Sequence, residues 1–258
     1  MSKNRTKQKI NWLTNELLKY CGPIFVTPSI DSYPAEMDAG TYALINTGTK
    51  HLLVTCCHVW DEYERQHDKD ERAVLAINLG EGDCIAFNNP LAHRLDIDRD
   101  LDLVALEFGP EGIAVPHNKS WFKISDWPIP RSGKGEYIVT LGFPKARRKT
   151  GGTNVTFGCA ALPFAITDTN DRSIAVFCDE ENKQVLNDVK DCLAGISGSP
   201  AYRLTEKGEL RLVGFAKSGS LESNASERTY RALADSPLGA HVSFTHASYL
   251  RQDGTFSR

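Results

Sequence analysis

The sequence GISGSP at residues 195–200 sets one serine between two glycines, immediately before a short run that reads as a strand. Glycine has no Cβ, so the backbone can turn sharply here and leave neighbouring N–H groups exposed. The stretch predicts a tight turn that presents the Ser197 hydroxyl. A plain turn before a strand would use the same residue types, so the rest of the chain has to decide between the two interpretations.

Two earlier segments carry the polar groups that a reactive serine needs. Residues 52–59 (LLVTCCHV) lead from an apolar run to His58, and residues 100–106 (DLDLVAL) set Asp102 directly before an apolar strand. A serine hydroxyl is a weak nucleophile and needs a base within hydrogen-bond reach. Histidine can take and return that proton near neutral pH, and a carboxylate fixes its tautomer. His58, Asp102 and Ser197 are therefore predicted to act together as a catalytic triad.

More than one aspartate could supply the carboxylate of this triad, because several lie close together before the apolar strand. Asp102 is preferred, since it abuts the strand directly, and Asp100 is the alternative. The negative oxygen of a tetrahedral intermediate also needs N–H donors, and losing one slows such a reaction on the order of 10²–10³-fold. The backbone N–H groups of Gly195 and Ser197 are the predicted oxyanion hole.

The three segments resemble the signatures of the trypsin-like serine peptidases. That family has a T-A-A-H box, an aspartate followed by an apolar strand, and a G-x-S-G-[GS]-P box, in this order and at similar separations. The matching stretches here are residues 55–58 (TCCH), 102–106 (DLVAL) and 195–200 (GISGSP). The order His, Asp, Ser differs from that of subtilisins and α/β-hydrolases. The resemblance covers residues 22–250 and implies a serine endopeptidase.

The fold that this resemblance implies is all-β, with two antiparallel six-stranded β-barrels and a cleft between them. The expected divisions are a helical extension over residues 1–21 and a peptidase domain over 22–258, with barrel one at about 22–126 and barrel two at about 134–250. The histidine and aspartate would come from the first barrel and the serine from the second. Short apolar or β-branched runs alternate with turn residues along the chain, which is typical of barrels and sandwiches.

Helices and connections are expected at five places. Apolar residues at helical spacing predict a helix over residues 8–20, and a second short helix is predicted over 245–250. The proline-rich stretch WPIPRSG at 127–133 is the expected internal boundary. The charged runs at 61–72 and 179–191 are interpreted as solvated loops or short helices.

Two departures from the family pattern bear on mechanism. Secreted trypsins have an aspartate before the nucleophile, which pairs with a new N-terminus after activation, and Ile196 cannot do this. The chain is therefore interpreted as closer to the bacterial HtrA-like and viral branches, which need no such cleavage. Cys56 and Cys57 replace two alanines beside His58, and buried cysteine packs as a small hydrophobe. Adjacent ligands lack the spacing of zinc sites, so no metal is predicted.

Substrate recognition is expected from residues on both sides of the nucleophile. Asp191 lies six residues before Ser197. An aspartate at that spacing in trypsin forms the floor of the primary pocket and selects Lys or Arg through a charge-assisted pair. Asp191 could equally belong to the acidic loop before the turn. Lys217, Ser218 and Gly219 would pair with the substrate backbone as an added strand.

Composition restricts the partners and the compartment. The chain has 258 residues, a formal net charge of −3 and no long apolar segment, so neither a nucleic acid nor a membrane is expected as a partner. It has seven cysteines and no recognisable signal sequence, which favours reduced thiols in a cytoplasm. The missing secretory features and the branch that the sequence resembles imply a bacterial source. No cofactor is expected.

Two functions of different classes remain open at this level. The first is an active serine endopeptidase acting on a protein or peptide substrate. The second is a binding or sensing module that retains the triad residues but is inactive or gated by a regulatory protein partner. An esterase of the α/β-hydrolase type is excluded by the missing G-x-S-x-G motif and by the chain order of the triad.

Overall fold

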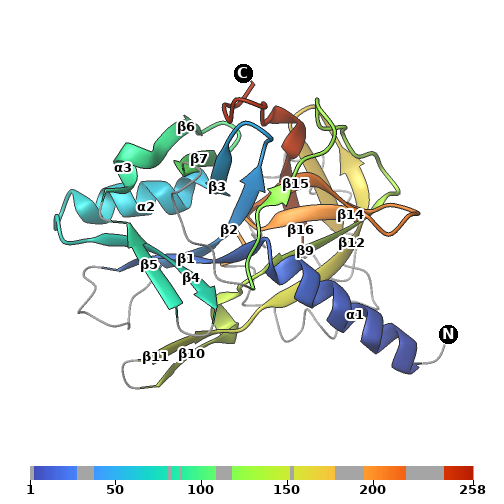
Figure 1. Cartoon of the computed structure of the whole chain (residues 1–258), viewed down its shortest axis with the longest axis horizontal. Helices are drawn as coiled ribbons and strands as arrows, with labels where there is room; N and C mark the ends of the chain where they lie inside the picture. Colours follow the sequence, from blue (N-terminus) through green and yellow to red (C-terminus); the bar gives the residue numbers. More distant parts are fainter. Residues whose placement is uncertain are drawn as a thin grey trace.

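The computed structural model describes residues 3–27, 38–80, 83–87, 89–108, 118–151, 154–177, 195–218 and 241–257. Within this part of the chain two β-sheets pack together, and helix α1 (Lys3–Leu18) lies along one side of the molecule (Figure 1). No helix in these ranges is long and apolar enough to cross a membrane.

The first sheet contains eight of the described strands. Seven follow the order β5-β4-β1-β2-β3-β7-β6, all antiparallel, and β8 adds to β2 in parallel. Their bounds are β1 (Cys21–Thr27), β2 (Asp38–Asn46), β3 (His51–Thr55), β4 (Val74–Gly80), β5 (Asp83–Phe87), β6 (Arg94–Asp98), β7 (Leu103–Phe108) and β8 (Phe122–Lys123).

The second sheet is a closed barrel with the order β12-β13-β16-β15-β14-β9. Its strands are β9 (Tyr137–Gly142), β12 (Ala160–Thr169), β13 (Ser173–Phe177), β14 (Pro200–Leu204), β15 (Leu210–Ser218) and β16 (His241–His246). A separate ribbon, β10 (Arg148–Gly151) and β11 (Asn154–Phe157), projects from the body of the molecule (Figure 1). The proline-rich residues 127–133 lie between β8 and β9 and so connect the two sheets.

The prediction of two packed antiparallel β units is confirmed, but the first unit is not a closed six-stranded barrel. Its end strands β5 and β6 do not pair with each other in the described residues. Helix α2 (Cys57–His67) packs against the sheet there, and its fully buried Trp60 lies in one apolar cluster with Leu75 of β4 and Leu106 of β7. Apolar contacts with a helix thus cover this part of the open sheet.

The charged run at 61–72 contributes to this helix, because acids and bases on one face alternate with buried Val59, Trp60 and Tyr63 on the other. The acidic run at 179–191 lies outside the described residues. The N-terminal helix is present but covers Lys3–Leu18 rather than 8–20. At its end Lys119 Nζ binds carbonyls of the chain, donating to that of Leu18 at 2.7 Å and that of Cys21 at 2.6 Å.

The short helix expected over residues 245–250 is confirmed only in part, because it is a 3₁₀ turn that begins later. Strand β16 continues to His246, and only one 3₁₀ turn follows, Ala247–Tyr249. The strand persists because β16 pairs with β13 on one side and β15 on the other, and this pairing closes the barrel. Tertiary pairing outweighs the local helical signal.

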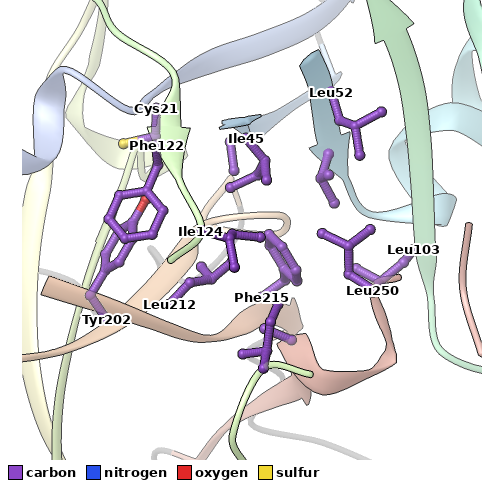
Figure 2. Packing of buried hydrophobic residues seen from close by; sticks show 14 of the residues in the cluster. Cys21, Ile45, Leu52, Leu103, Phe122, Ile124, Tyr202, Leu212, Phe215 and Leu250 are labelled. Atoms are coloured by element: carbon purple, nitrogen blue, oxygen red, sulfur yellow. The ribbon is translucent and has the colours of Figure 1, made fainter. Parts of the chain in front are cut away.

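A continuous apolar core joins the two sheets. Ile45, Leu52 and Leu103 of the first sheet lie in one cluster with Tyr202 and Phe215 of the barrel (Figure 2). Burying each such side chain fully contributes about 1.5–3 kcal/mol relative to leaving it exposed. The sheets are therefore held in one relative position, which matters for any site made from both.

One buried histidine of β16, His246, predicts a pH-dependent stability. His246 Nε2 lies 3.0 Å from the carbonyl oxygen of Asn170 and 3.1 Å from Thr169 Oγ1, while its Nδ1 is buried with no hydrogen-bond partner in the described part of the chain. Burial lowers the pKa of His246 below its usual 6.5. The bond to Asn170 opposes this shift, the charge of Arg131 adds to it, and that of Asp171 opposes it.

We expect the free energy of unfolding to fall as the pH drops below about 6.5. The unfolded chain takes up a proton at His246 before the native state does, so this stability is complete above the unfolded pKa and is lost toward the lowered native pKa. Urea unfolding between about pH 7.5 and 5 should show a shallower pH slope for His246→Gln than for His51→Gln, which alters a histidine of the other sheet. Equal slopes would contradict the assignment to His246.

Candidate active site

His58 lies in the first turn of α2, directly after β3 ends at Thr55. The residue before the helix, Cys56, has no side-chain cap on the helix N-terminus. The free N–H groups there are instead satisfied by the Asp102 segment: His58 N–H donates to Asp102 Oδ1 at 3.0 Å, and Cys57 N–H donates to the Asp102 carbonyl at 3.1 Å. A carboxylate is favoured at this end of a helix dipole.

The same carboxylate binds the imidazole ring. Nδ1 of His58 lies 2.9 Å from Asp102 Oδ2 and 3.1 Å from Oδ1. A carboxylate only accepts, so Nδ1 carries the proton, and in the neutral ring Nε2 is left with a free lone pair. The His58 side chain is 49% exposed and that of Asp102 15% exposed, so the ring meets solvent while the acid behind it is largely covered.

The alternative acid, Asp100, does not pair with the His58 ring in the described structure. Its backbone carbonyl accepts a hydrogen bond from Lys217 Nζ at 2.8 Å, and the ring of His58 pairs with Asp102. Asp102 also adopts a left-handed backbone conformation, with φ of 57°, which is unusual for a residue with a side chain.

The predicted serine turn forms as a tight loop before β14. Gly195 and Gly198 have φ values of 99° and 86°, in the left-handed region that glycine tolerates. Ser199 N–H closes the turn on the Ile196 carbonyl at 2.8 Å. Ile196 is fully buried in the apolar cluster of the closed barrel, which anchors the turn, while Ser197 itself is 7% exposed.

The serine turn and the histidine segment are in direct contact. Gly198 N–H and the Cys56 thiol both donate to the carbonyl of Ala216, at 2.7 and 3.0 Å. A Cβ on Gly198 would overlap the carbonyl oxygen of Thr41 and lie 2.6 Å from Thr55 Oγ1. The structure therefore brings the loop of Ser197 against the residues that precede His58.

The predicted nucleophile, Ser197, and the predicted base, His58, are on touching segments, but their side chains are not hydrogen-bonded to each other. Within the described ranges no hydrogen bond joins Ser197 Oγ and His58 Nε2. Such contacts are often long in a substrate-free enzyme and shorten in the complex.

The predicted oxyanion donors have no acceptor among the described residues, whereas the carbonyls beside them are occupied. Thr41 N–H donates to the Ser197 carbonyl at 2.7 Å, and Thr41 Oγ1 donates to the Gly195 carbonyl at 2.8 Å. The Thr41 hydroxyl also accepts from Phe143 N–H at 3.3 Å. Sequence reasoning missed Thr41, because nothing marks a threonine in the middle of β2 as a contact 154 residues along the chain.

The predicted substrate-binding residues are only partly visible. Asp191 and Gly219 lie outside the described residues. Ser218 ends β15, and Lys217 lies at a bulge in that strand between the pairs formed by Ala216 and Ser218. The Lys217 ammonium binds the carbonyl of Asp100, so its charge is directed to the segment that carries Asp102, the predicted acid of the triad.

The donor atoms of Cys56, His58 and Asp102 all lie within 4.8 Å of one another. They are already engaged with one another or with backbone. Burial raises the pKa of the Cys56 thiol well above its usual range, and the protonated sulfur donates to the Ala216 and Lys217 carbonyls at 3.0 and 3.4 Å. Within this trio the imidazole is therefore paired with the carboxylate, and the cysteine is bound to backbone.

No protein-family model matches the chain, and no curated protein matches its sequence. Among solved structures, the chain is similar to a thermostable serine protease, AL20, from an extremophilic microorganism. The identity is 13%, the match covers 88% of this chain and 90% of that one, and the TM-score is 0.48. That likeness assigns no residue, and the candidate site rests on the geometry given above.

Proposed function

We propose that this protein is a serine endopeptidase with the trypsin-like arrangement of His58, Asp102 and Ser197. The observation that carries the proposal is the Asp102 carboxylate bound to His58 Nδ1 on a segment that touches the serine turn. An imidazole held in this tautomer, with Nε2 free, is what a serine hydroxyl needs as its base.

The proposed reaction follows from these groups. Ser197 Oγ attacks the peptide carbonyl carbon while His58 Nε2 takes the hydroxyl proton, and the carbonyl oxygen becomes the oxyanion. The N–H groups of Gly195 and Ser197 hold that oxygen. The C–N bond then breaks, the leaving amine receives the proton from His58, and a water molecule hydrolyses the acyl-serine by the same route in reverse.

Activation by a newly formed N-terminus is not part of this proposal. Ile196 is fully buried in an apolar cluster, so the position before the nucleophile offers no carboxylate to an incoming amine. This supports a branch like the bacterial HtrA-type and viral enzymes. The five cysteines in the described ranges are free thiols, which supports a reducing setting such as the cytoplasm.

A gated binding or sensing module is the second candidate, because the described residues contain no hydrogen bond between Ser197 and His58. In that case a partner protein would have to bring the Ser197 hydroxyl and the His58 ring into hydrogen-bond contact before any chemistry occurs.

A fluorophosphonate probe separates the two candidates. We expect the wild-type protein to react at one site, mapped by mass spectrometry to Ser197, and the heat-denatured protein not to react. Ser199→Ala is the matched control, because Ser199 Oγ is buried without a hydrogen-bond partner in the described structure, and its loss should leave labelling unchanged. No adduct under any condition would favour the module, and an adduct at another serine would refute the proposed nucleophile.

A further inference from the structure

The loop that carries Asp102 is held by hydrogen bonds that other segments donate to three of its consecutive backbone carbonyls. Lys217 Nζ donates to the Asp100 carbonyl at 2.8 Å, Thr245 Oγ1 to the Leu101 carbonyl at 2.6 Å, and Cys57 N–H to the Asp102 carbonyl at 3.1 Å. Strands β15 and β16 of the closed barrel supply the first two donors, and helix α2 supplies the third. The closed barrel, whose strand β14 follows the Ser197 turn, thus also contacts the loop that carries Asp102.

Two of these bonds, to the Leu101 and Asp102 carbonyls, act on the peptide planes on either side of the Asp102 Cα. The Leu101 carbonyl lies in the same rigid plane as Asp102 N, and the Asp102 carbonyl lies in the next plane. Pinning both planes fixes φ and ψ of Asp102, and with them the direction of its Cβ. Asp102 has a φ of 57°, a conformation that persists in a non-glycine residue only where its surroundings hold it.

We propose that Thr245 is a positioning residue for the triad, on the premise that the proposed function holds. Its hydroxyl fixes the Leu101–Asp102 peptide and thereby directs the Asp102 carboxylate at His58 Nδ1. Thr245 suits this role better than Lys217 because it is 1% exposed, has a branched and stiff side chain, and makes the shorter bond. The orientation of the acid then depends on the docking of the closed barrel against the first sheet.

The test compares Thr245→Val, which keeps the shape but removes the donor, with Thr245→Ser, which keeps the hydroxyl. We expect the valine variant to react with the fluorophosphonate about 10- to 100-fold more slowly at saturating probe, with unchanged probe affinity, because the acid is misplaced. The serine variant should restore the rate. Thr47→Val is the matched control, because Thr47 is also a buried threonine donating to a carbonyl, that of Gln252 at 2.7 Å, in a turn at the far end of β3.

A second measurement does not depend on activity. The proton on His58 Nδ1 should give a low-field NMR signal because it is bound to a carboxylate, and this signal should weaken or shift in Thr245→Val but not in Thr245→Ser or Thr47→Val. If the wild type is unlabelled while the NMR signal responds in this way, the positioning role stands and the proposed function fails. If Thr245→Val matches Thr47→Val in both measurements, the positioning role is refuted. Should the valine variant not fold, Thr245→Cys, with its weak donor, replaces it with the same expected outcomes.

Discussion

Changing Asp102 to asparagine is expected to slow fluorophosphonate labelling of Ser197 by roughly 10³–10⁴-fold, the scale known for loss of this carboxylate in serine proteases. The physical reason is the tautomer of the ring. Asp102 Oδ2 accepts from His58 Nδ1 at 2.9 Å, and an amide NH₂ group at that position would favour an unprotonated Nδ1. The ring proton would then reside on Nε2, and a protonated Nε2 cannot accept the proton of the serine hydroxyl.

The fold should tolerate this change. In the variant Asp102→Asn the amide oxygen of the new side chain can still accept from His58 N–H, as Asp102 Oδ1 does at 3.0 Å, so the start of α2 remains capped. Thermal melting should therefore be close to that of the wild type while the labelling rate collapses.

Asp100→Asn is the matched control for this experiment. It makes the same chemical change two residues away, at the alternative acid, where the described contact of the residue is its backbone carbonyl. We expect Asp100→Asn to label at nearly the wild-type rate, with Ser197→Ala defining the background. Equal losses in Asp100→Asn and Asp102→Asn would show that the loop, rather than the His58–Asp102 pair, governs reactivity.

Gly198→Ala is expected to destabilise the protein by about 3–5 kcal/mol or to prevent folding, which is at the upper end for single substitutions. The new Cβ would overlap the Thr41 carbonyl oxygen and lie 2.6 Å from Thr55 Oγ1 and 3.1 Å from Cys56 N. Two of these neighbours are backbone atoms of β2 and of the segment before α2, so they cannot yield by a side-chain rotation. Relief would require the serine turn to separate from the histidine segment.

Gly208→Ala isolates the conformational part of this cost. Gly208 has a φ of 81°, close to the 86° of Gly198, but a Cβ there would meet nothing within 4 Å. We expect it to cost only about 1–2 kcal/mol, the penalty of a left-handed alanine. Urea unfolding of both variants measures the difference, and similar values would mean that the contact between the two segments is not tight.

Local sequence patterns identified the predicted catalytic side chains of the candidate site, but they did not identify the residues that hold these side chains in place. His58, Asp102 and Ser197 stand out because each is a polar residue at the edge of an apolar run, with glycines beside the serine. Thr41 and Thr245 carry no such mark. Each is a strand residue whose role arises from a hydrogen bond to a carbonyl more than 140 residues away in sequence.

The fold shows the same division. The sequence alone indicated a β-rich chain in two parts joined at residues 127–133, because short alternating apolar runs and proline-rich breaks are local properties. Closure of only the second barrel could not be read in this way. It depends on whether β5 and β6 pair, and in the described residues they do not, while the apolar face of α2, with Trp60, packs on the same sheet.

By itself, the sequence determined which groups can perform acid–base and nucleophilic chemistry, since that depends on residue type and on nearby glycines. Only the tertiary structure decided that Asp102 rather than Asp100 faces the His58 ring, and that Lys217 turns its charge toward the acid loop. The physical reason is that hydrogen bonds select partners by distance and direction in space. Those two quantities are set by the packing of two sheets through a shared apolar core, and no stretch of chain contains both sides of that contact.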